Sequence, residues 1–460
     1  MTMLSLLAVV CVASAAAQTP WAANTAKHYP PSPDTWANLT WALTGPGAPG
    51  IYNSSHTPDS QYGMYNCKCS PVPLTAGCNM PHVRAQEYVV PGDEYELVYV
   101  EAVQRHHKRT PYASNTLFHE DASWDCPDTG PYAHARAATF STAPVYWQGA
   151  GNPANPFEKA VGGFVNSTCR FPSITTDGLE DARQHGADFG GVYADLLGFL
   201  PSGSERHAYA FRVTNNVITS ATLSAFAVGL HPCEAEYAAQ IQPLAYDSLE
   251  PTFACPAAAR LLSLIRAEPE WQAHLSASAA LMRRIDAVAH RREWQASYDP
   301  AYDNFSAKQC HARALPLPLS QADADTVYRL GQWEYAYTYR ASRRSTAYAA
   351  LKMGAWMREL SAHLRADDGV KYRHNFAHDG SVAALLGLLQ AARPMWPGMG
   401  AELVFEVWRA SGQEDRVRVL WSGRALETDT PLGTLDMVAL RDLLAYLDDT
   451  IPADLVSACA

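Results

Sequence analysis

The sequence predicts an α/β fold in which a central, mostly parallel sheet is flanked by helices and covered by a largely helical cap. Strand-like and helix-like segments alternate along the chain, which is typical of a sheet built from strand–helix–strand units. The middle of the chain is rich in helical patterns and would form the cap. The chain has 460 residues, 48% of them hydrophobic, and so contains enough apolar side chains for one large domain.

We divide the chain into a signal peptide at residues 1–17 and a single folded unit at residues 18–460. Within that unit, core and cap segments are expected to alternate along the sequence. The α/β core comprises about residues 60–118, 205–232 and 370–460, and the cap comprises about residues 119–204 and 233–369.

Several segments have the composition of strands. Residues 95–103 are apolar enough to lie inside a sheet with both faces covered. Residues 207–230 indicate a strand, a polar turn and a helix. The segments 401–408 and 416–423 predict a hairpin, because a polar loop at 409–415 joins two strand-like runs.

Other segments carry apolar side chains at helical spacing. Residues 256–290 are predicted to be helical, with a buried set of Leu261, Leu262, Ile265, Trp271, Leu275, Leu281 and Ile285. Residues 345–364 predict another helix, with Ala349, Met353, Trp356, Leu360 and Leu364 on its buried face. The apolar run 382–392 predicts a short buried helix.

The first residues indicate export from the cell. Residues 4–12 form an apolar run, and Ala15, Ala16 and Ala17 then offer a cleavage site before Gln18. The run is too short to span a membrane, so we interpret it as a signal peptide and expect a secreted protein.

Cysteines and glycosylation sequons agree with an oxidising, secreted setting. Nine cysteines remain after residue 17, and most should pair as disulfides, with one left free or paired between chains. Asn-x-Ser/Thr sequons predict glycosylation at Asn38, Asn53, Asn166 and Asn304.

The formal net charge is −11, which argues against general nucleic-acid binding because that function needs a broadly basic face. One local basic cluster stands out. Directly after the predicted strand 95–103 the chain reads Arg105-His106-His107-Lys108-Arg109. Ligands of open α/β sheets bind beyond the carboxyl ends of strands, and this position suits a small anion.

These residue types suggest phosphate chemistry. An arginine matches phosphate oxygens with two parallel hydrogen bonds, and an imidazole between two arginines can attack phosphorus directly. The alternative from this segment alone is a solvated basic loop.

Three motifs, in order, resemble those of the histidine acid phosphatase family, branch 2 of the histidine phosphatase superfamily. The first is Arg-His-x-x-Arg-x-Pro, beginning at Arg105. The second is Arg212 in "FRVTNNVITSATLSAF", and the third is the pair His378 and Asp379 in "HNFAHDGSVAALLGLL".

The resemblance implies a role for each of these residues. His106 would be the nucleophile that becomes phosphohistidine, and Asp379 the general acid for the departing alcohol. The phosphoryl oxygens would be bound by Arg105, Arg109, Arg212 and His378. The family's chemistry implies no metal and no cofactor, because the arginines supply the positive charge.

The sequence departs from the family pattern at two places. His107 stands where a glycine is usual, and we expect it to point outward as a surface residue, with contact to the phosphate as the alternative. A further arginine that many members carry beyond the position of Arg212 is absent. Lys108 is expected to be a solvated charge, with contact to further phosphates of a substrate as the alternative.

Together these observations predict a secreted acid phosphatase that hydrolyses phosphate monoesters through a phosphohistidine. A phytase acting on inositol hexakisphosphate is the alternative within the family. A non-catalytic secreted glycoprotein that binds phosphorylated ligands is the alternative of another class. The expected partner is a small phosphate monoester, with no nucleic-acid or membrane partner, and the oligomeric state stays open.

Overall fold

A computed structural model of the chain describes residues 27–31, 38–46, 78–118, 124–126, 129–130, 132–133, 145–146, 169, 172–200, 205–231, 237–290, 293–366 and 368–460. Some predicted features lie outside these residues: the signal peptide, the sequons at Asn53 and Asn166, and Cys67, Cys69 and Cys233.

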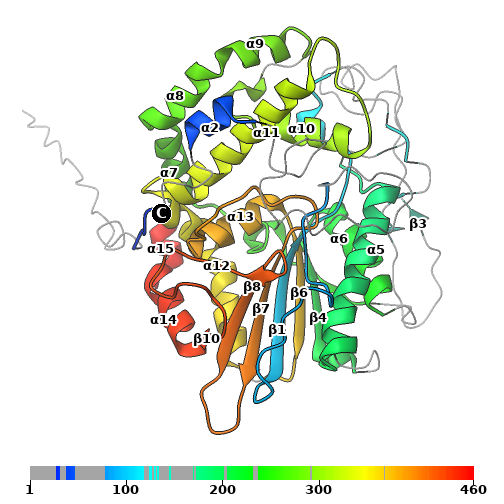
Figure 1. Cartoon of the computed structure of the whole chain (residues 1–460), viewed down its shortest axis with the longest axis vertical. Coiled ribbons are helices and arrows are strands. Elements are labelled where there is room, and N and C mark those ends of the chain that lie inside the picture. The colour runs from blue at the N-terminus through cyan, green and yellow to red at the C-terminus, as the bar shows by residue number, and fades with distance from the viewer. Residues whose placement is uncertain are drawn as a thin grey trace, which may run out of the picture.

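A mixed central sheet organises the molecule, and its strands run mostly parallel, which confirms the predicted fold class (Figure 1). The strand order is β10-β8-β7-β1-β6-β4-β5, with β9 beside β8. The central strand β1 pairs in parallel with β6 and antiparallel with β7. The strands are β1 (Glu96–Arg105), β4 (Tyr209–Val213), β5 (Ala239–Gln240), β6 (Tyr372–Ala377), β7 (Glu402–Arg409), β8 (Arg416–Trp421), β9 (Arg424–Ala425) and β10 (Val438–Ala439). A separate pair consists of β2 (Tyr132–Ala133) and β3 (Val145–Tyr146).

Strand β1 extends two residues beyond the predicted end at position 103. Gln104 pairs with Phe376 of β6, and Arg105 pairs with Ala377, so the ladder continues through two polar residues. Because both side chains are buried and hydrogen-bonded, polarity does not end the strand here. The predicted hairpin is confirmed as the antiparallel pair β7 and β8.

Helices cover both faces of the sheet. Side chains alternate along β1, so Val100 faces α5 (Thr176–Gly190) and α6 (Val217–Leu230), whereas Val103 faces α12 (Ser345–Arg365) and α13 (Asp379–Leu388). Trp356 of α12 packs on Phe405 of β7, with ring centroids 6.4 Å apart. The helices α5 and α12 therefore cover the sheet, although their residues fall in ranges that the sequence analysis gave to the cap.

The cap lies beyond the carboxyl ends of the strands, at the top of Figure 1. It consists of α2 (Leu39–Thr44), α7 (Pro256–Arg266), α8 (Pro269–Ala277), α9 (Ala279–Asp286), α10 (Asp299–Cys310) and α11 (Gln321–Ala336). The helical stretch predicted at 256–290 is thus three helices. Pro269 lacks the N–H that a continuing helix needs and keeps Glu268 in an extended conformation.

The chain ends in α14 (Leu440–Thr450) and α15 (Leu455–Cys459). Short 3-10 and π-helical segments are η1 (Ala113–Asn115), η3 (Gly191–Leu196), η4 (Arg206–Ala208), η5 (Leu244–Tyr246), η6 (Glu293–Ala296) and η7 (Tyr337–Ala341). None of the helices in the described part of the chain has the length and apolar character that crossing a membrane requires.

All six cysteines within the described residues form disulfides: Cys78–Cys310, Cys126–Cys169 and Cys255–Cys459. The first bridge joins the segment before β1 to the end of α10, and the third joins α7 to α15.

Two predicted glycosylation sites can be located. Asn38 is exposed at the start of α2, where its side chain accepts a hydrogen bond from the Trp41 N–H at 3.2 Å. Asn304 is 0% exposed, and its side-chain nitrogen donates to the Asn115 carbonyl at 2.9 Å. The folded chain has no room for a glycan on Asn304, so that prediction is wrong.

Helices α5 and α6 touch backbone to backbone at two glycines. A Cβ atom on Gly229 would lie 1.9 Å from the Arg183 carbonyl oxygen, and one on Gly186 would lie 2.0 Å from that of Phe226. Gly191, at the end of α5, is in a helical conformation and has nothing within 4 Å of the same position.

We predict that Gly229→Ala lowers the free energy of unfolding by about 1–3 kcal/mol, because the helices must separate to admit the methyl group. Urea titration followed by circular dichroism measures this. Gly191→Ala is the matched control and should leave the midpoint equal or higher. Equal midpoints for Gly229→Ala and wild type would contradict the close contact.

Candidate active site

His106 follows β1 directly, and its orientation is fixed by two hydrogen bonds. The ring is 1% exposed, and Nδ1 donates to the His107 carbonyl at 2.9 Å. The Nε2 atom then carries the lone pair and accepts a hydrogen bond from Arg109 Nε at 3.3 Å. Burial, followed by the charges of Arg109 and Arg105, holds the pKa of His106 well below its ordinary value. The lowered pKa favours the neutral ring, in which Nε2 carries the lone pair that can attack an electrophile.

The two arginines of the motif lie on either side of this histidine, and each is paired. Arg105 contacts Asp379 Oδ2 at 2.9 Å and donates to the Pro397 carbonyl at 2.7 Å. Arg109 contacts Asp303 Oδ1, from α10, at 2.8 Å. Both guanidiniums are buried and so held in fixed positions.

His378 and Asp379 lie at the start of α13, directly after β6. Because β6 is the parallel neighbour of β1, the two motifs meet at one edge of the sheet. The His106 and His378 rings are 5.5 Å apart, centroid to centroid. The Nε2 atom of His378 lies 2.9 Å from Thr214 Oγ1 and 3.2 Å from Glu250 Oε2.

Asp379 is bound as a carboxylate. Its Oδ2 accepts from Trp396 Nε1 at 3.1 Å in addition to the contact with Arg105, and its Oδ1 accepts from the Gly380 N–H at 2.8 Å. Burial alone would raise the pKa of Asp379, but the charges of Arg105, Arg109 and His378 outweigh it and lower that pKa.

An aromatic stack holds Trp396 in place. Its indole ring lies between Tyr302 of α10 and Tyr335 of α11, with centroids 3.7 Å away on each side. The cap therefore orients the indole N–H that Asp379 accepts. Sequence reasoning missed Trp396, Asp303 and Glu250, because none of them belongs to a motif. It also missed Thr214, which lies within the motif of Arg212 but was given no role there.

Arg212 is not brought together with the other five predicted site residues. Phe211 faces α6, so the next side chain on β4 points to the opposite face, toward α12. There Arg212 contacts Glu359 Oε2 at 2.6 Å and Asp247 Oδ1 at 3.1 Å. It also donates to Gln242 and Ser248.

Two residues next to the nucleophile are buried, contrary to prediction. His107 is 0% exposed, so the expectation of a surface residue is wrong. Gly400, at φ +70°, makes room for it, because a Cβ there would lie 2.4 Å from His107 Cε1. Lys108 is also buried and contacts Asp181 of α5 at 2.9 Å, so it is not a solvated charge.

His107 belongs to a buried histidine layer formed by His82, His107, His185 and His374 between the sheet and α5. His107 Nε2 lies 3.2 Å from His185 Nδ1, and the His185 ring stacks on His82 with centroids 3.8 Å apart. His185 Nε2 lies 3.0 Å from Glu402 of β7, and His374 Nδ1 accepts from the Tyr372 hydroxyl at 2.6 Å. Burial holds the pKa values of His82, His107 and His374 well below the ordinary value.

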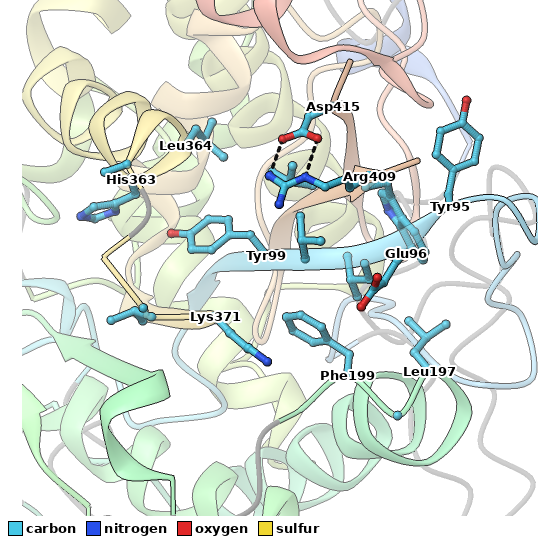
Figure 2. A pocket seen from close by; sticks show the side chains of 18 of the residues that line it. Tyr95, Glu96, Tyr99, Leu197, Phe199, His363, Leu364, Lys371, Arg409 and Asp415 are labelled. Atoms are coloured by element: carbon cyan, nitrogen blue, oxygen red, sulfur yellow. Dashed lines mark hydrogen bonds and ion pairs between the residues drawn. The ribbon is translucent and has the colours of Figure 1, made fainter. Parts of the chain in front are cut away.

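A cavity of about 690 Å³ lies at the amino-terminal end of β1, opposite the candidate active site (Figure 2). Its lining includes Glu96, Phe199, Lys371 and the ion-paired Arg409 and Asp415. None of the six predicted site residues lines it. A second cavity, of about 590 Å³, includes Arg212 alone among those six. Within the described ranges, no three or more His, Cys, Asp or Glu side chains are arranged so that they could hold a metal ion, and this includes the histidine layer.

The model of the histidine phosphatase superfamily (branch 2) matches residues 96–422, from β1 to the turn after β8. The chain belongs to this superfamily. Solved branch 2 folds are similar to it: a Klebsiella sp ASR1 phytase superposes with a TM-score of 0.53 at 17% identity, covering 80% of this chain and 98% of that one. Hafnia alvei phytase in its apo form superposes with a TM-score of 0.51 at 15% identity, covering 80% of this chain and 99% of that one.

A relative by sequence is "Counting factor 60" of Dictyostelium discoideum, 23% identical over 336 residues, which are 69% of this chain and 77% of the relative. At these identities the solved structures establish the fold of this member of the superfamily.

We predict that His374→Phe weakens the pH dependence of stability. Below pH 6.5 the histidines with lowered pKa values bind protons mainly in the unfolded chain, so the free energy of unfolding falls as pH falls. Removing one such group should reduce that slope by about 1.4 kcal/mol per pH unit.

Urea titrations between pH 6.5 and 5 measure this slope. The control is His207→Phe, because His207 is an exposed histidine beside β4. A slope for His374→Phe equal to that of the wild type would show that His374 does not titrate differently in the folded and unfolded states.

Proposed function

We propose that this histidine phosphatase hydrolyses phosphate monoesters through a phosphohistidine on His106. The observation that carries the proposal is the state of the imidazole. Its Nδ1 donates to a carbonyl, burial and the neighbouring arginines lower its pKa, and its Nε2 accepts a hydrogen bond from the Arg109 guanidinium. A phosphoryl group bound to the arginines would thus have a nucleophile already oriented toward it.

In the first step, Nε2 of His106 forms a bond to phosphorus as the ester P–O bond breaks. The bonding electrons leave with the alcohol oxygen, which takes a proton from Asp379. In the second step, water attacks the phosphohistidine and the P–N bond breaks. The water proton returns to Asp379, and inorganic phosphate leaves.

Charge on the phosphoryl oxygens would be stabilised by Arg105, Arg109 and His378. Substrate binding would change the surroundings of Asp379. A phosphate dianion that takes the Arg105 guanidinium removes the contact at 2.9 Å and adds a like charge nearby. Both changes raise the pKa of Asp379, so acidic conditions favour the protonated form that the first step needs.

Arg212 would contribute indirectly in this scheme. Its guanidinium is shared by Asp247 and Glu359, and Asp247 begins the turn that carries Glu250 to His378. We therefore assign Arg212 a positioning role in place of the direct phosphate contact expected from the motif.

We predict that Asp379→Asn lowers kcat for an alkyl phosphate by about 10²–10⁴-fold and for 4-nitrophenyl phosphate far less, because a nitrophenolate leaves without a proton. Steady-state assays at acidic pH measure both. His106→Ala is expected to abolish turnover of both esters. Equal losses for the two esters in Asp379→Asn would argue against the acid role. Binding of phosphate without release of phenol by the wild type would favour a phospho-ligand-binding protein.

We also propose that the protein is secreted after removal of residues 1–17. Three disulfides among the described residues support an oxidising compartment. Expression in a eukaryotic secretory cell is expected to give medium-borne protein that begins at Gln18. The glycan on Asn38 should be lost in Asn38→Gln and unchanged in Asn304→Gln. Retention of the first 17 residues would contradict the proposal.

A further inference from the structure

The turn at residues 247–250, here called the Glu250 loop, places a carboxylate at the candidate active site. Asp247 Oδ1 accepts from the N–H groups of Leu249 at 2.9 Å and Glu250 at 3.3 Å. The same oxygen contacts Arg212 at 3.1 Å. The loop is thus closed on itself and anchored to β4.

A second anchor ties the Glu250 loop to the helix that carries Asp379. The Ser381 hydroxyl, in the first turn of α13, donates to the Leu249 carbonyl at 2.6 Å. The Glu250 side chain is held between these anchors with Oε2 3.2 Å from His378 Nε2, while 34% of it is exposed. Solvent therefore reaches the Glu250 side chain, whereas the nucleophile His106 is buried.

The positive charges of the site are matched by carboxylates. Arg105 pairs with Asp379, and Arg109 with Asp303. The pair of His378 and Glu250 lies beside them, and Lys352 of α12 interacts electrostatically with Glu250 and Asp379. Once a phosphate dianion binds, the described groups leave no cationic surplus for further phosphates on the same substrate.

An aromatic ring packs on one of the arginines of the same site. Tyr112 is half-buried, with the Arg109 guanidinium 4.3 Å from its ring centroid. Burial raises the pKa of Tyr112 to about 12, and the charges of Asp379 and Glu250 contribute to that rise. Carboxylates attract ammonium groups through opposite charge, and aromatic rings bind them through cation–π contacts, so the Glu250 carboxylate and the Tyr112 ring supply both kinds of group to this site.

We propose that Glu250 is a specificity-determining residue that selects phosphate monoesters whose alcohol carries a positive charge, as amino alcohols do. Such a cation would lie beside the Glu250 carboxylate and Tyr112 while the phosphoryl group is at His106. Substrates with several phosphates would instead bring negative charge to Glu250. The inference rests on the proposed phosphatase function.

Two phosphate esters of the same shape test whether a positive charge on the alcohol increases turnover. Phosphocholine carries a quaternary ammonium, and 3,3-dimethylbutyl phosphate has a neutral carbon in its place. We expect kcat/KM of the wild type to be about five- to thirtyfold higher for phosphocholine, which is the range for one partly exposed ion pair with a cation–π contact. Inositol hexakisphosphate should be hydrolysed more slowly than either.

In Glu250→Gln, the ratio of the two kcat/KM values should fall to near one. A ratio within one variant cancels any effect of the substitution on His378, because both esters share the chemical step. The control Glu180→Gln makes the same change in net charge at an exposed ion pair on α5 and should keep the wild-type ratio.

The outcomes separate the two proposals. If the wild type hydrolyses 4-nitrophenyl phosphate but has nearly equal kcat/KM values for phosphocholine and 3,3-dimethylbutyl phosphate, the role of Glu250 is overturned and the proposed phosphatase activity stands. The wild-type measurement decides this even if Glu250→Gln fails to fold. A ratio that is unchanged in a folded Glu250→Gln would also overturn it. No turnover of any ester would overturn the phosphatase itself.

Discussion

The parallel pairing of β1 with β6 is the constraint on which the candidate active site depends. Arg105 pairs with Ala377 at the end of this ladder, so the residues that follow on each strand emerge side by side. His106 and His378 are the first residues beyond it, and their rings meet although 272 positions separate them in the sequence. A shift of one residue in this register would turn the buried set of β1 to the wrong face of the sheet.

The cap supplies the side chains that fix the positions of Asp379 and Arg109. Tyr302 and Asp303 are neighbours on α10, yet one stacks on the indole that binds Asp379 and the other binds Arg109. A single helix therefore positions both the proposed acid and a proposed phosphate ligand. Buried guanidiniums need such partners, because an unpaired buried charge is strongly unfavourable.

The sequence allowed much of this to be predicted where the signal is local. The strand at β1, the hairpin of β7 and β8 and the apolar face of α12 each depend on periodicity within one segment. The meeting of His106 with His378, and of Arg105 with Asp379, follows from motifs placed after parallel strands.

The failures share a physical cause, which is that the deciding partner is remote in sequence. Arg212 was expected to contact the phosphate, but the alternation of side chains along β4 turns it toward Glu359. Glu359 belongs to α12, a helix that the sequence analysis placed in the cap and not against the sheet. His107 and Lys108 were expected at the surface, whereas His185 and Asp181 of α5 give them buried partners. Glu250 was missed because its partner His378 is remote in sequence. Trp396 was missed because Tyr302 and Tyr335, which orient its ring toward Asp379, are remote in sequence.

The contact between Asp379 and Arg105 has a consequence for turnover. The free site already contains an anion on Arg105, so under the proposed chemistry the Asp379 carboxylate would compete with a phosphate group for that guanidinium. Inorganic phosphate would leave Arg105 before a new ester binds, and Asp379 would occupy the guanidinium as that product departs. Under the proposed chemistry, this exchange weakens product inhibition and returns the acid to its starting position after each cycle.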